Sequence, residues 1–274
     1  MNFLTQSKSL LVASVLWAGA ANGLSAHEFW MEPVDSHVPV GTTLMVNTTI
    51  GVAFAGDLLA NFPSMQKTVD LNFNGQSVAV SGPVSQQPAL QAPTLGDGLH
   101  VMRYQSRDFQ VTYQDFQKFV SFLKEAERPD ILDLHRARGL PEENLREVYF
   151  RYSKTLIDVG SGQGSDSFLG MPFELVALTN PYADPAPQAI ELELRFLEQP
   201  QPKAAIHVFR RAPDGTISNF RLRTDDQGRF TVPATDKGYY LINAIHILEA
   251  SERMKFLLGA SWQSLWASMT YDIE

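Results

Sequence analysis

Short β-branched and aromatic segments, separated by turn residues, recur along most of this chain and constrain its fold more than any other feature. Residues 42–50 and 100–104 are typical of strands. Residues 69–73 and 76–80 flank the dipeptide Asn74-Gly75, which favours a tight hairpin turn. This pattern predicts a mainly β fold.

One segment has the periodicity of a helix instead. Apolar residues at the spacing i, i+3, i+4 and i+7 lie on one helical face, namely Phe116, Phe119, Val120 and Leu123. Pro129 ends this helix, and a second helical turn is expected at residues 130–138, capped by Asp130 and ended by Gly139. We therefore expect a short helical insertion near residues 115–138. The β-branched and aromatic content of residues 146–159 favours a strand.

Three prolines in residues 180–187 favour extended backbone and interrupt regular pairing, so this segment is the best candidate for a domain boundary. Strand-like segments follow in quick succession at residues 190–197, 204–211, 217–224, 229–232 and 239–247. The sequence predicts two β-sandwich-like domains. Residues 27–186 form the first, with the helical insertion, and residues 187–274 form a small sandwich of immunoglobulin or transthyretin type.

Residues 1–26 have the pattern of a signal peptide, in which Lys8 precedes an apolar core at residues 10–21 and small residues follow. The core is shorter than the roughly 20 apolar residues that span a bilayer. No later stretch approaches that length, so no transmembrane segment is predicted in the mature chain. We expect cleavage after Ala26, and cuts after Ala20 or Gly23 also meet the requirement for a small residue.

The composition excludes several classes of site and partner. The chain has no cysteine, so it has neither disulfides nor a thiolate metal site. Its net charge is −8 and its pI is about 5.3, and loss of Lys8 with the signal peptide makes the charge more negative. Without a basic run, nucleic-acid binding is not expected.

His27 becomes the first residue if cleavage falls after Ala26. Its α-amine and imidazole could then close a chelate ring on one metal ion, which no internal histidine can do. Nitrogen ligands in a tetragonal arrangement suit Cu(II) or Ni(II), and imidazole also suits Co(II) and Zn(II). The other interpretation is an exposed residue beside Phe29 and Trp30, which anchor the first strand.

A chelate on one residue needs further ligands. His246 lies in a strand-like run, where it is either a partly buried core residue or a ligand. His207 and His37 are weaker candidates, the first on a predicted strand and the second near the N-terminus. The remaining histidines, His100 and His135, have the least support.

No enzyme motif is present. The chain lacks Gly-x-Ser-x-Gly, His-Glu-x-x-His and calcium-loop patterns, so neither a hydrolase nor a metalloprotease is predicted. Trp262 and Trp266 indicate core packing, with the wall of a binding site as the alternative.

Four stretches in order resemble an exported bacterial family of unknown function that is often described as the periplasmic component of a cobalt or nickel transport system. The first is residues 27–33 (HEFWMEP), and the second is residues 146–160 (REVYFRYSKTLIDVG). The third comprises residues 170–176 (GMPFELV) and 180–182 (NPY). The fourth comprises residues 244–246 (AIH) and 262–271 (WQSLWASMTY). The resemblance implies a periplasmic protein of two β-rich domains that handles a transition metal. It implies that His27 and His246 are ligands, since both fall inside matching motifs.

The leading hypothesis is therefore a non-enzymatic periplasmic protein that binds Ni, Co or Cu and passes the ion to a membrane uptake system. The alternative is a metal-independent module that binds a peptide, glycan or protein partner through strand edges and aromatic residues. A copper oxidase is the third interpretation, and the sequence offers no substrate-binding signal for it.

Overall fold

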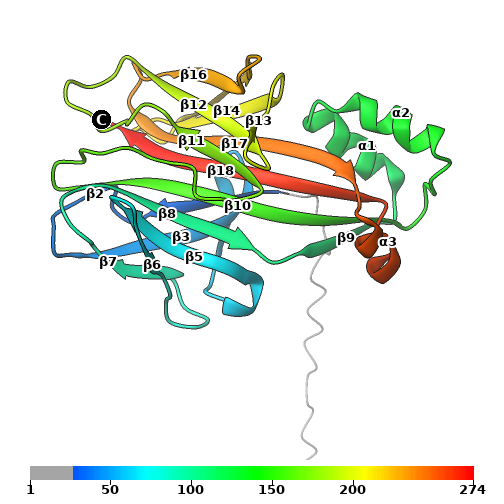
Figure 1. Ribbon diagram of the computed structural model, residues 1–274, viewed down its shortest axis with the longest axis horizontal. Coiled ribbons are helices and arrows are strands. Elements are labelled where there is room, and N and C mark those ends of the chain that lie inside the picture. The colour runs from blue at the N-terminus through cyan, green and yellow to red at the C-terminus, as the bar shows by residue number, and fades with distance from the viewer. Residues whose placement is uncertain (1–26) are drawn as a thin grey trace, which may run out of the picture.

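The computed structural model describes residues 27–274. The predicted signal peptide, residues 1–26, lies outside the described residues, as does the bond at which we expect cleavage. The described chain contains eighteen strands and three α-helices (Figure 1), which confirms the predicted mainly β fold. None of these helices is both long and apolar enough to cross a membrane.

The strands of the first half are two to ten residues long. They are β1 (Glu28–Pro33), β2 (His37–Val38), β3 (Thr43–Val52), β4 (Ala55–Leu59), β5 (Gln66–Phe73), β6 (Gln76–Ala79), β7 (Leu90–Pro93), β8 (Gly98–Ser106) and β9 (Phe109–Tyr113). A 3-10 turn, η1 (Pro63–Met65), precedes β5. The predicted hairpin is confirmed: Asn74 and Gly75 join β5 to β6, and both have the positive φ that such a turn requires.

The second half holds the longest strands. They are β10 (Leu145–Val159), β11 (Phe173–Ala177), β12 (Ala189–Phe196), β13 (Gln199–Pro200), β14 (Ala205–Arg211), β15 (Ile217–Arg223), β16 (Arg229–Pro233), β17 (Gly238–Glu249) and β18 (Trp262–Ile273). The helices are α1 (Phe116–Glu125), α2 (Pro129–Ala137) and α3 (Glu252–Leu258).

A ten-stranded sheet forms the centre of the molecule. Its main path runs β15-β14-β17-β18-β10-β8-β5-β6, and β10 lies parallel to β18 while the other neighbours on this path are antiparallel. Strands from both sides of the predicted boundary near residue 186 therefore share one sheet. The division into domains stays a prediction.

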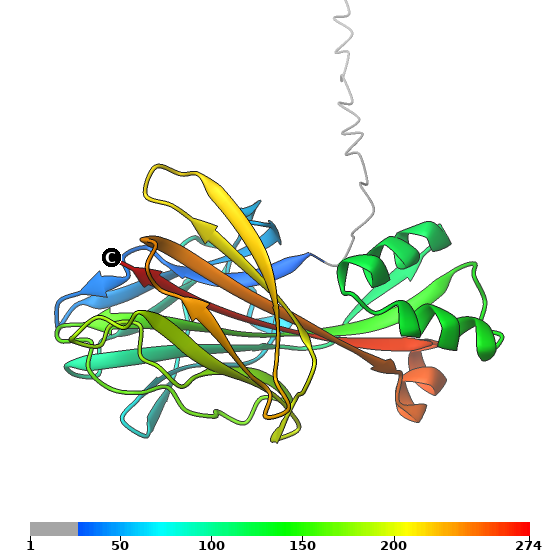
Figure 2. The ribbon, with the colours of Figure 1, turned by 90° about the horizontal axis from the view of Figure 1, so that it is seen from above.

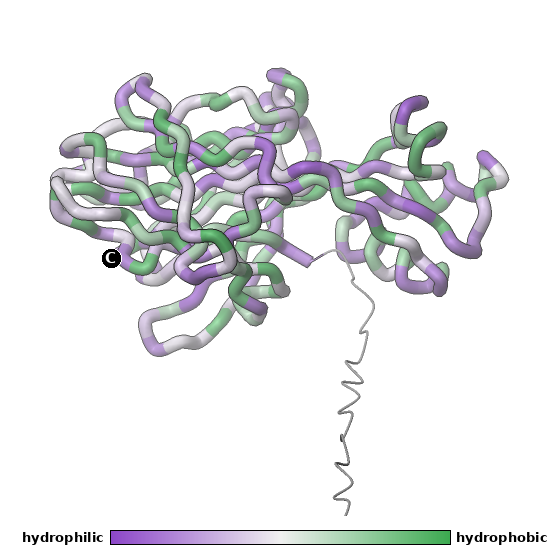
Figure 3. Tube along the Cα trace, turned by 90° about the horizontal axis from the view of Figure 1, so that it is seen from below, coloured by the Kyte–Doolittle hydropathy of each residue, from purple (hydrophilic) through white to green (hydrophobic). Residues whose placement is uncertain are grey.

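Smaller sheets cover both faces of the central sheet (Figures 1 and 2). On one face, Ile242 and Ala244 of β17 share a core with Phe173 of β11. On the other face, Leu241 packs against Trp30 of β1. Successive side chains of β17 thus face different layers, as strand geometry requires. In Figure 3 hydrophobic residues are spread along the whole described chain and interspersed with hydrophilic ones.

The helical insertion is confirmed and packs on the same face as β1. Asp115 caps α1 by accepting a hydrogen bond from the amide of Gln117. The buried phenylalanines of α1 contact Trp262 and Trp266 of β18, so the two tryptophans have the predicted core role. The second helix begins at Pro129 rather than after an Asp130 cap, and Asp130 lies in its first turn.

A buried charge cluster fixes the glycine-rich segment 160–170 to the other face of the sheet. Lys154 of β10 lies 3.0 Å from Asp166 and 2.6 Å from Glu174, and all three side chains are at most 1% exposed. Asp166 also accepts from the amide of Ala177, at 2.9 Å. Residues 160–170 are therefore attached to β10 and β11 through the buried carboxylate of Asp166.

Candidate functional site

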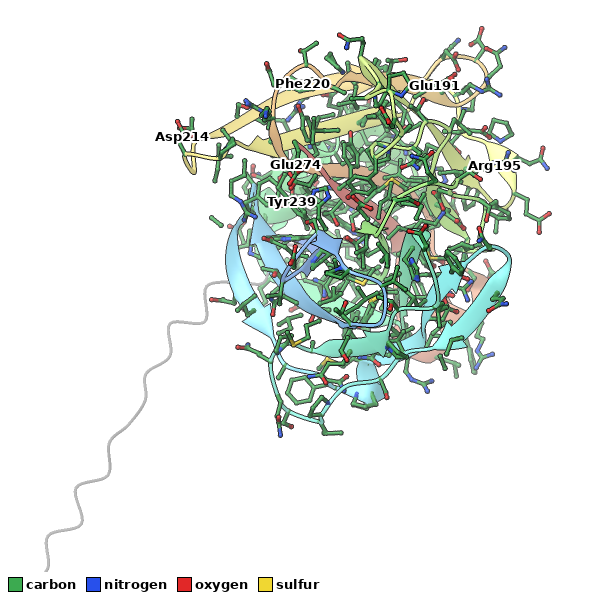
Figure 4. The ribbon with its side chains drawn as sticks, turned by 90° about the vertical axis from the view of Figure 1, so that its left-hand side faces the viewer. Glu191, Arg195, Asp214, Phe220, Tyr239 and Glu274 are labelled. Atoms are coloured by element: carbon green, nitrogen blue, oxygen red, sulfur yellow. The ribbon has the colours of Figure 1, made fainter. Side chains whose placement is uncertain are left out.

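A cleft of about 680 Å³ lies at the end of the molecule that carries the C-terminus. Its walls are the end of β1, the loop that leads to β2, the turn between β14 and β15, and the last residues of β18. Figure 4 looks onto this end, with Tyr239 and Glu274 near its middle and Asp214 on the β14–β15 turn. We call this cavity the end cleft.

His37 projects into the end cleft with its two ring nitrogens in different surroundings. Strand β2 pairs with the end of β10, which places Nδ1 of His37 2.9 Å from Oδ2 of Asp158. Nε2 is 3.6 Å from Asp272 Oδ2 and 3.4 Å from Glu274 Oε1. Within the described residues Nε2 is buried and has no hydrogen-bond partner. One nitrogen is thus held by a carboxylate, while the other faces two carboxylates.

The carboxylates around His37 favour a proton on its ring. Asp272 makes the largest contribution, and with Asp158 and Glu274 it raises the pKa of His37 to about 9, although burial acts in the opposite direction. Without a cation, His37 is therefore a protonated ion-pair partner at neutral pH. Tyr182 supports the ring edge-on, with the two centroids 5.4 Å apart.

The same atoms are spaced as metal ligands. One donor atom each from His37, Asp272 and Glu274 lies within 4.8 Å of the others, and this is the only such set of three in residues 27–274. Ligands at about 2.0–2.1 Å in a tetrahedral site are separated by about 3.4 Å. The two distances from Nε2 are close to that value, and the carboxylate oxygens of Asp272 and Glu274 lie within 4.8 Å of each other.

The opposite wall of the end cleft is held by a separate ion pair. Arg211 contacts the carboxylate of Glu32, and its guanidinium lies 4.9 Å from the centroid of the Phe54 ring and 5.4 Å from that of Tyr239. Because Glu32 is neutralised by Arg211, the free negative charge of the cleft is concentrated around His37.

The structure does not bring the two chief predicted ligands together. His246 lies on β17 on the face that carries β11 and β12, with ring centroids 4.4 Å from Phe196 and 5.7 Å from Phe173. Burial lowers its pKa to about 4. His27 directly precedes β1, on the other face of the sheet. The assignment of His246 as a ligand stays a prediction that the geometry does not support.

The other histidines have different surroundings. His207 of β14 is 7% exposed and lies on the β1 face, where burial lowers its pKa. His100 accepts a hydrogen bond from the amide of Leu95 and stacks on Phe73. His135 accepts one from the indole of Trp262. His100 and His135 therefore have structural roles.

Sequence reasoning named His37 only as a weak candidate and missed its three carboxylate neighbours. Asp158 is the penultimate residue of β10, and Asp272 and Glu274 follow more than 100 residues further along the sequence. They meet because β10 and β18 run parallel in adjacent positions. No spacing in the sequence carries that information.

Fold and site together define a sandwich-like β protein with a candidate cation site at one end. A family model described as a domain of unknown function (DUF4198) matches residues 24–248, and the chain belongs to this family. This match confirms the resemblance to a family of unknown function and does not address cobalt or nickel transport. The family description names no enzyme activity.

No match was found among proteins of curated function. Two of the solved structures that align with the chain both have a TM-score of 0.22. One is a tetra-tandem repeat in the extending region of a large adhesion protein, at 10% identity over 91% of this chain and 50% of the other. The second is the D0-D1 domain of intimin, at 9% identity over 89% of this chain and 97% of the other. Likeness at this level carries no argument about function.

Proposed function

We propose that this protein binds a divalent transition-metal ion at His37, Asp272 and Glu274 in the end cleft. As an exported, periplasmic protein it would hold Ni, Co or Cu and pass the ion to a membrane uptake system. The observation that carries the proposal is the position of His37 Nε2, which makes no hydrogen bond within the described residues and lies 3.6 Å from the carboxylate of Asp272 and 3.4 Å from that of Glu274.

The contact on the far side of the ring supports the same conclusion. Metal-binding histidines usually donate their second ring N–H to a carboxylate, which orients the ring and increases its basicity. Asp158 provides this contact to Nδ1 at 2.9 Å. The carboxylates of Asp272 and Glu274 also supply two negative charges, which a divalent ion neutralises.

The donor set favours exchange of the ion over permanent retention. One imidazole and two carboxylates form a mixed nitrogen and oxygen site that accepts several divalent ions rather than selecting one. The side chain of Glu274 is 73% exposed and that of His37 is 27% exposed, so solvent and a partner can reach the ion. Such exposure suits a protein that transfers its metal.

Calorimetric titration of residues 27–274 with Ni(II), Co(II), Cu(II) and Zn(II) tests the proposal. Glu274 lies at the exposed end, so the informative variants are His37→Gln and Asp272→Asn, each expected to weaken binding by at least about tenfold. Asp214→Asn is the matched control, because Asp214 lies on the β14–β15 turn at the same end of the molecule but outside the set of three. Equal affinity in all variants would contradict the proposal.

The same experiment distinguishes the metal-binding function from the alternative function. A metal-independent module for a peptide, glycan or protein partner predicts no metal after purification without chelators. It also predicts no effect of His37→Gln on partner binding.

A further inference from the structure

The layer of β11, β12 and β13 leaves part of the central sheet uncovered, and a cavity of about 460 Å³ lies there. This layer turns back after β12, while β17 and β18 continue toward α3 (Figure 1). Most of the lining comes from five adjacent strands, in the order β17-β18-β10-β8-β5, and from the β12–β13 turn. The cavity shares no lining residue with the end cleft. We call it the sheet cavity.

One side of the sheet cavity is apolar. Leu248 of β17 and Leu265 of β18 line this side, and Gln263 is its one polar side chain. Phe150 and Tyr152 of β10 line the middle, with nearly parallel rings whose centroids are 6.5 Å apart. An aromatic or aliphatic group can therefore bury its surface against β10, β17 and β18.

The β12–β13 turn adds two more apolar side chains. The ring of Phe196 packs on that of His246, with the centroids 4.4 Å apart, which fixes its position. Leu197 is 60% exposed although it lines the cavity, and its amide donates a hydrogen bond to the carbonyl of Pro172 at 2.9 Å. Exposed apolar surface beside a cavity is typical of a binding site.

Two buried polar side chains line the same cavity. Gln105 of β8 is 7% exposed and Tyr152 is 3% exposed. No hydrogen bond joins either side chain to another group within residues 27–274. Burial raises the pKa of Tyr152, with no contribution from a hydrogen bond or a neighbouring charge. Because buried polar groups need hydrogen-bond partners, the hydroxyl and the amide are available to a polar group inside the cavity.

The charges at the rim favour an anion. Lys67 of β5 and Arg107, just after β8, are exposed lining residues, and Asp108 is the one acidic residue of the lining. None of the three side chains forms a salt bridge within the described residues. Two cations and one carboxylate leave a net positive charge here, although the whole chain has a net charge of −8. The positive charge lies beside β5 and β8, opposite the apolar side.

We infer that the sheet cavity binds a small aromatic carboxylate, with its ring over Phe150 and its carboxylate toward Gln105 and Lys67. The volume lies within the range of about 300–1,000 Å³ that is usual for small-molecule sites. Three aromatic side chains favour a ring over an aliphatic chain, because aromatic pairs gain energy beyond the area that they bury. The inference does not depend on the proposed metal site.

Calorimetric titration of residues 27–274 with 2-naphthylacetate at pH 7 tests the inference. We expect a dissociation constant below about 1 mM. The neutral analogue 2-naphthylacetamide should bind at least about tenfold more weakly, because it lacks the charge-assisted hydrogen bonds. Decanoate, an aliphatic carboxylate, should also bind more weakly. Intermolecular nuclear Overhauser effects from the naphthyl protons to the methyl groups of Leu248 and Leu265 should locate the probe.

Tyr152→Phe removes one hydroxyl and should lower the affinity about three- to tenfold. Tyr104→Phe is the matched control, because Tyr104 is also a buried tyrosine of the central sheet, 6% exposed, but packs in the core on the opposite face with Phe29. Lys67→Gln should lower the affinity for the carboxylate and leave that for the amide unchanged. Far-ultraviolet circular dichroism and thermal unfolding confirm that each variant folds.

Three results would each overturn the inference: no binding at about 1 mM, equal affinity for the carboxylate and the amide, or equal affinity of Tyr152→Phe and Tyr104→Phe. Tighter binding of decanoate than of 2-naphthylacetate would overturn the aromatic class. His37→Gln should bind 2-naphthylacetate as tightly as the unmodified protein, so the metal site and the sheet cavity are judged separately.

Discussion

Replacing Lys154 by Met is expected to destabilise the protein more than the same substitution at any other lysine. Lys154 is 1% exposed and contacts Asp166 at 3.0 Å and Glu174 at 2.6 Å, while neither carboxylate is exposed. Met has a similar length and no charge. The variant therefore leaves two buried carboxylates without their cation and changes the packing little.

The size of the effect follows from these contacts. Removing one partner of a buried ion pair costs about 3–5 kcal/mol. Asp166 keeps hydrogen bonds from the amides of Ser167 and Ala177, and Glu174 keeps two more amide donors. These donors place the expected loss at the lower end of the range, about 3 kcal/mol. In a domain of this size that corresponds to a fall in Tm of about 6–12 °C.

Urea denaturation at pH 7, followed by circular dichroism, measures this loss. Lys118→Met is the matched control, because Lys118 lies on the exposed face of α1, and its stability should change by less than about 0.5 kcal/mol. Adding Glu174→Gln to Lys154→Met should recover part of the loss, since one unpaired charge is removed. A loss below about 1 kcal/mol for Lys154→Met would refute the reasoning, because it would mean that the buried carboxylates do not need the lysine.

Three further predictions concern the carboxylates and the metal. Asp158→Asn keeps all three proposed ligands but is expected to weaken metal binding about 10–100-fold in calorimetry, and an unchanged affinity would show that the contact to Nδ1 has no role. The pKa of about 9 means that His37 carries a proton at pH 7, and a metal ion must displace it. The affinity for the metal should therefore rise about tenfold per pH unit from pH 7 to 9 and then level off. A flat profile in a titration with a competing chelator would argue against His37 as a ligand. Burial raises the pKa of Glu147 to about 7 from the ordinary glutamate value of about 4.5, so the folded state holds this proton more tightly than the unfolded state does. Stability therefore falls by up to about 3 kcal/mol as pH rises from 4.5 through 7. Glu147→Gln should remove that part of the fall in urea denaturation, and equal pH profiles for both proteins would contradict this assignment.

Much of the fold could be predicted from local pattern. The hairpin at Asn74 and Gly75 follows from backbone conformations that few other residues adopt, and α1 follows from the spacing of its buried phenylalanines. The order of strands in the central sheet could not be predicted, because β10 and β18 are separated by more than 100 residues and pair in parallel. Local sequence carries no signal for such a long-range pairing.

The candidate site was harder to predict for the same reason. His37 was recognised as a possible ligand by residue type, but its partners Asp158 and Asp272 reach it through strand pairing alone. The prediction of His246 as a ligand did not take into account the face of the sheet on which it lies. One residue along β17 reverses the face to which a side chain points, so His246 packs on Phe196 while Asn243 faces β1.

The most direct test of the central claim is an anomalous difference map from a crystal of residues 27–274 grown with Co(II). The account predicts a peak at about 2.0–2.2 Å from Nε2 of His37 and from carboxylate oxygens of Asp272 and Glu274. Absence of a peak there, at a Co(II) concentration that saturates the protein in calorimetry, would contradict the proposed metal site.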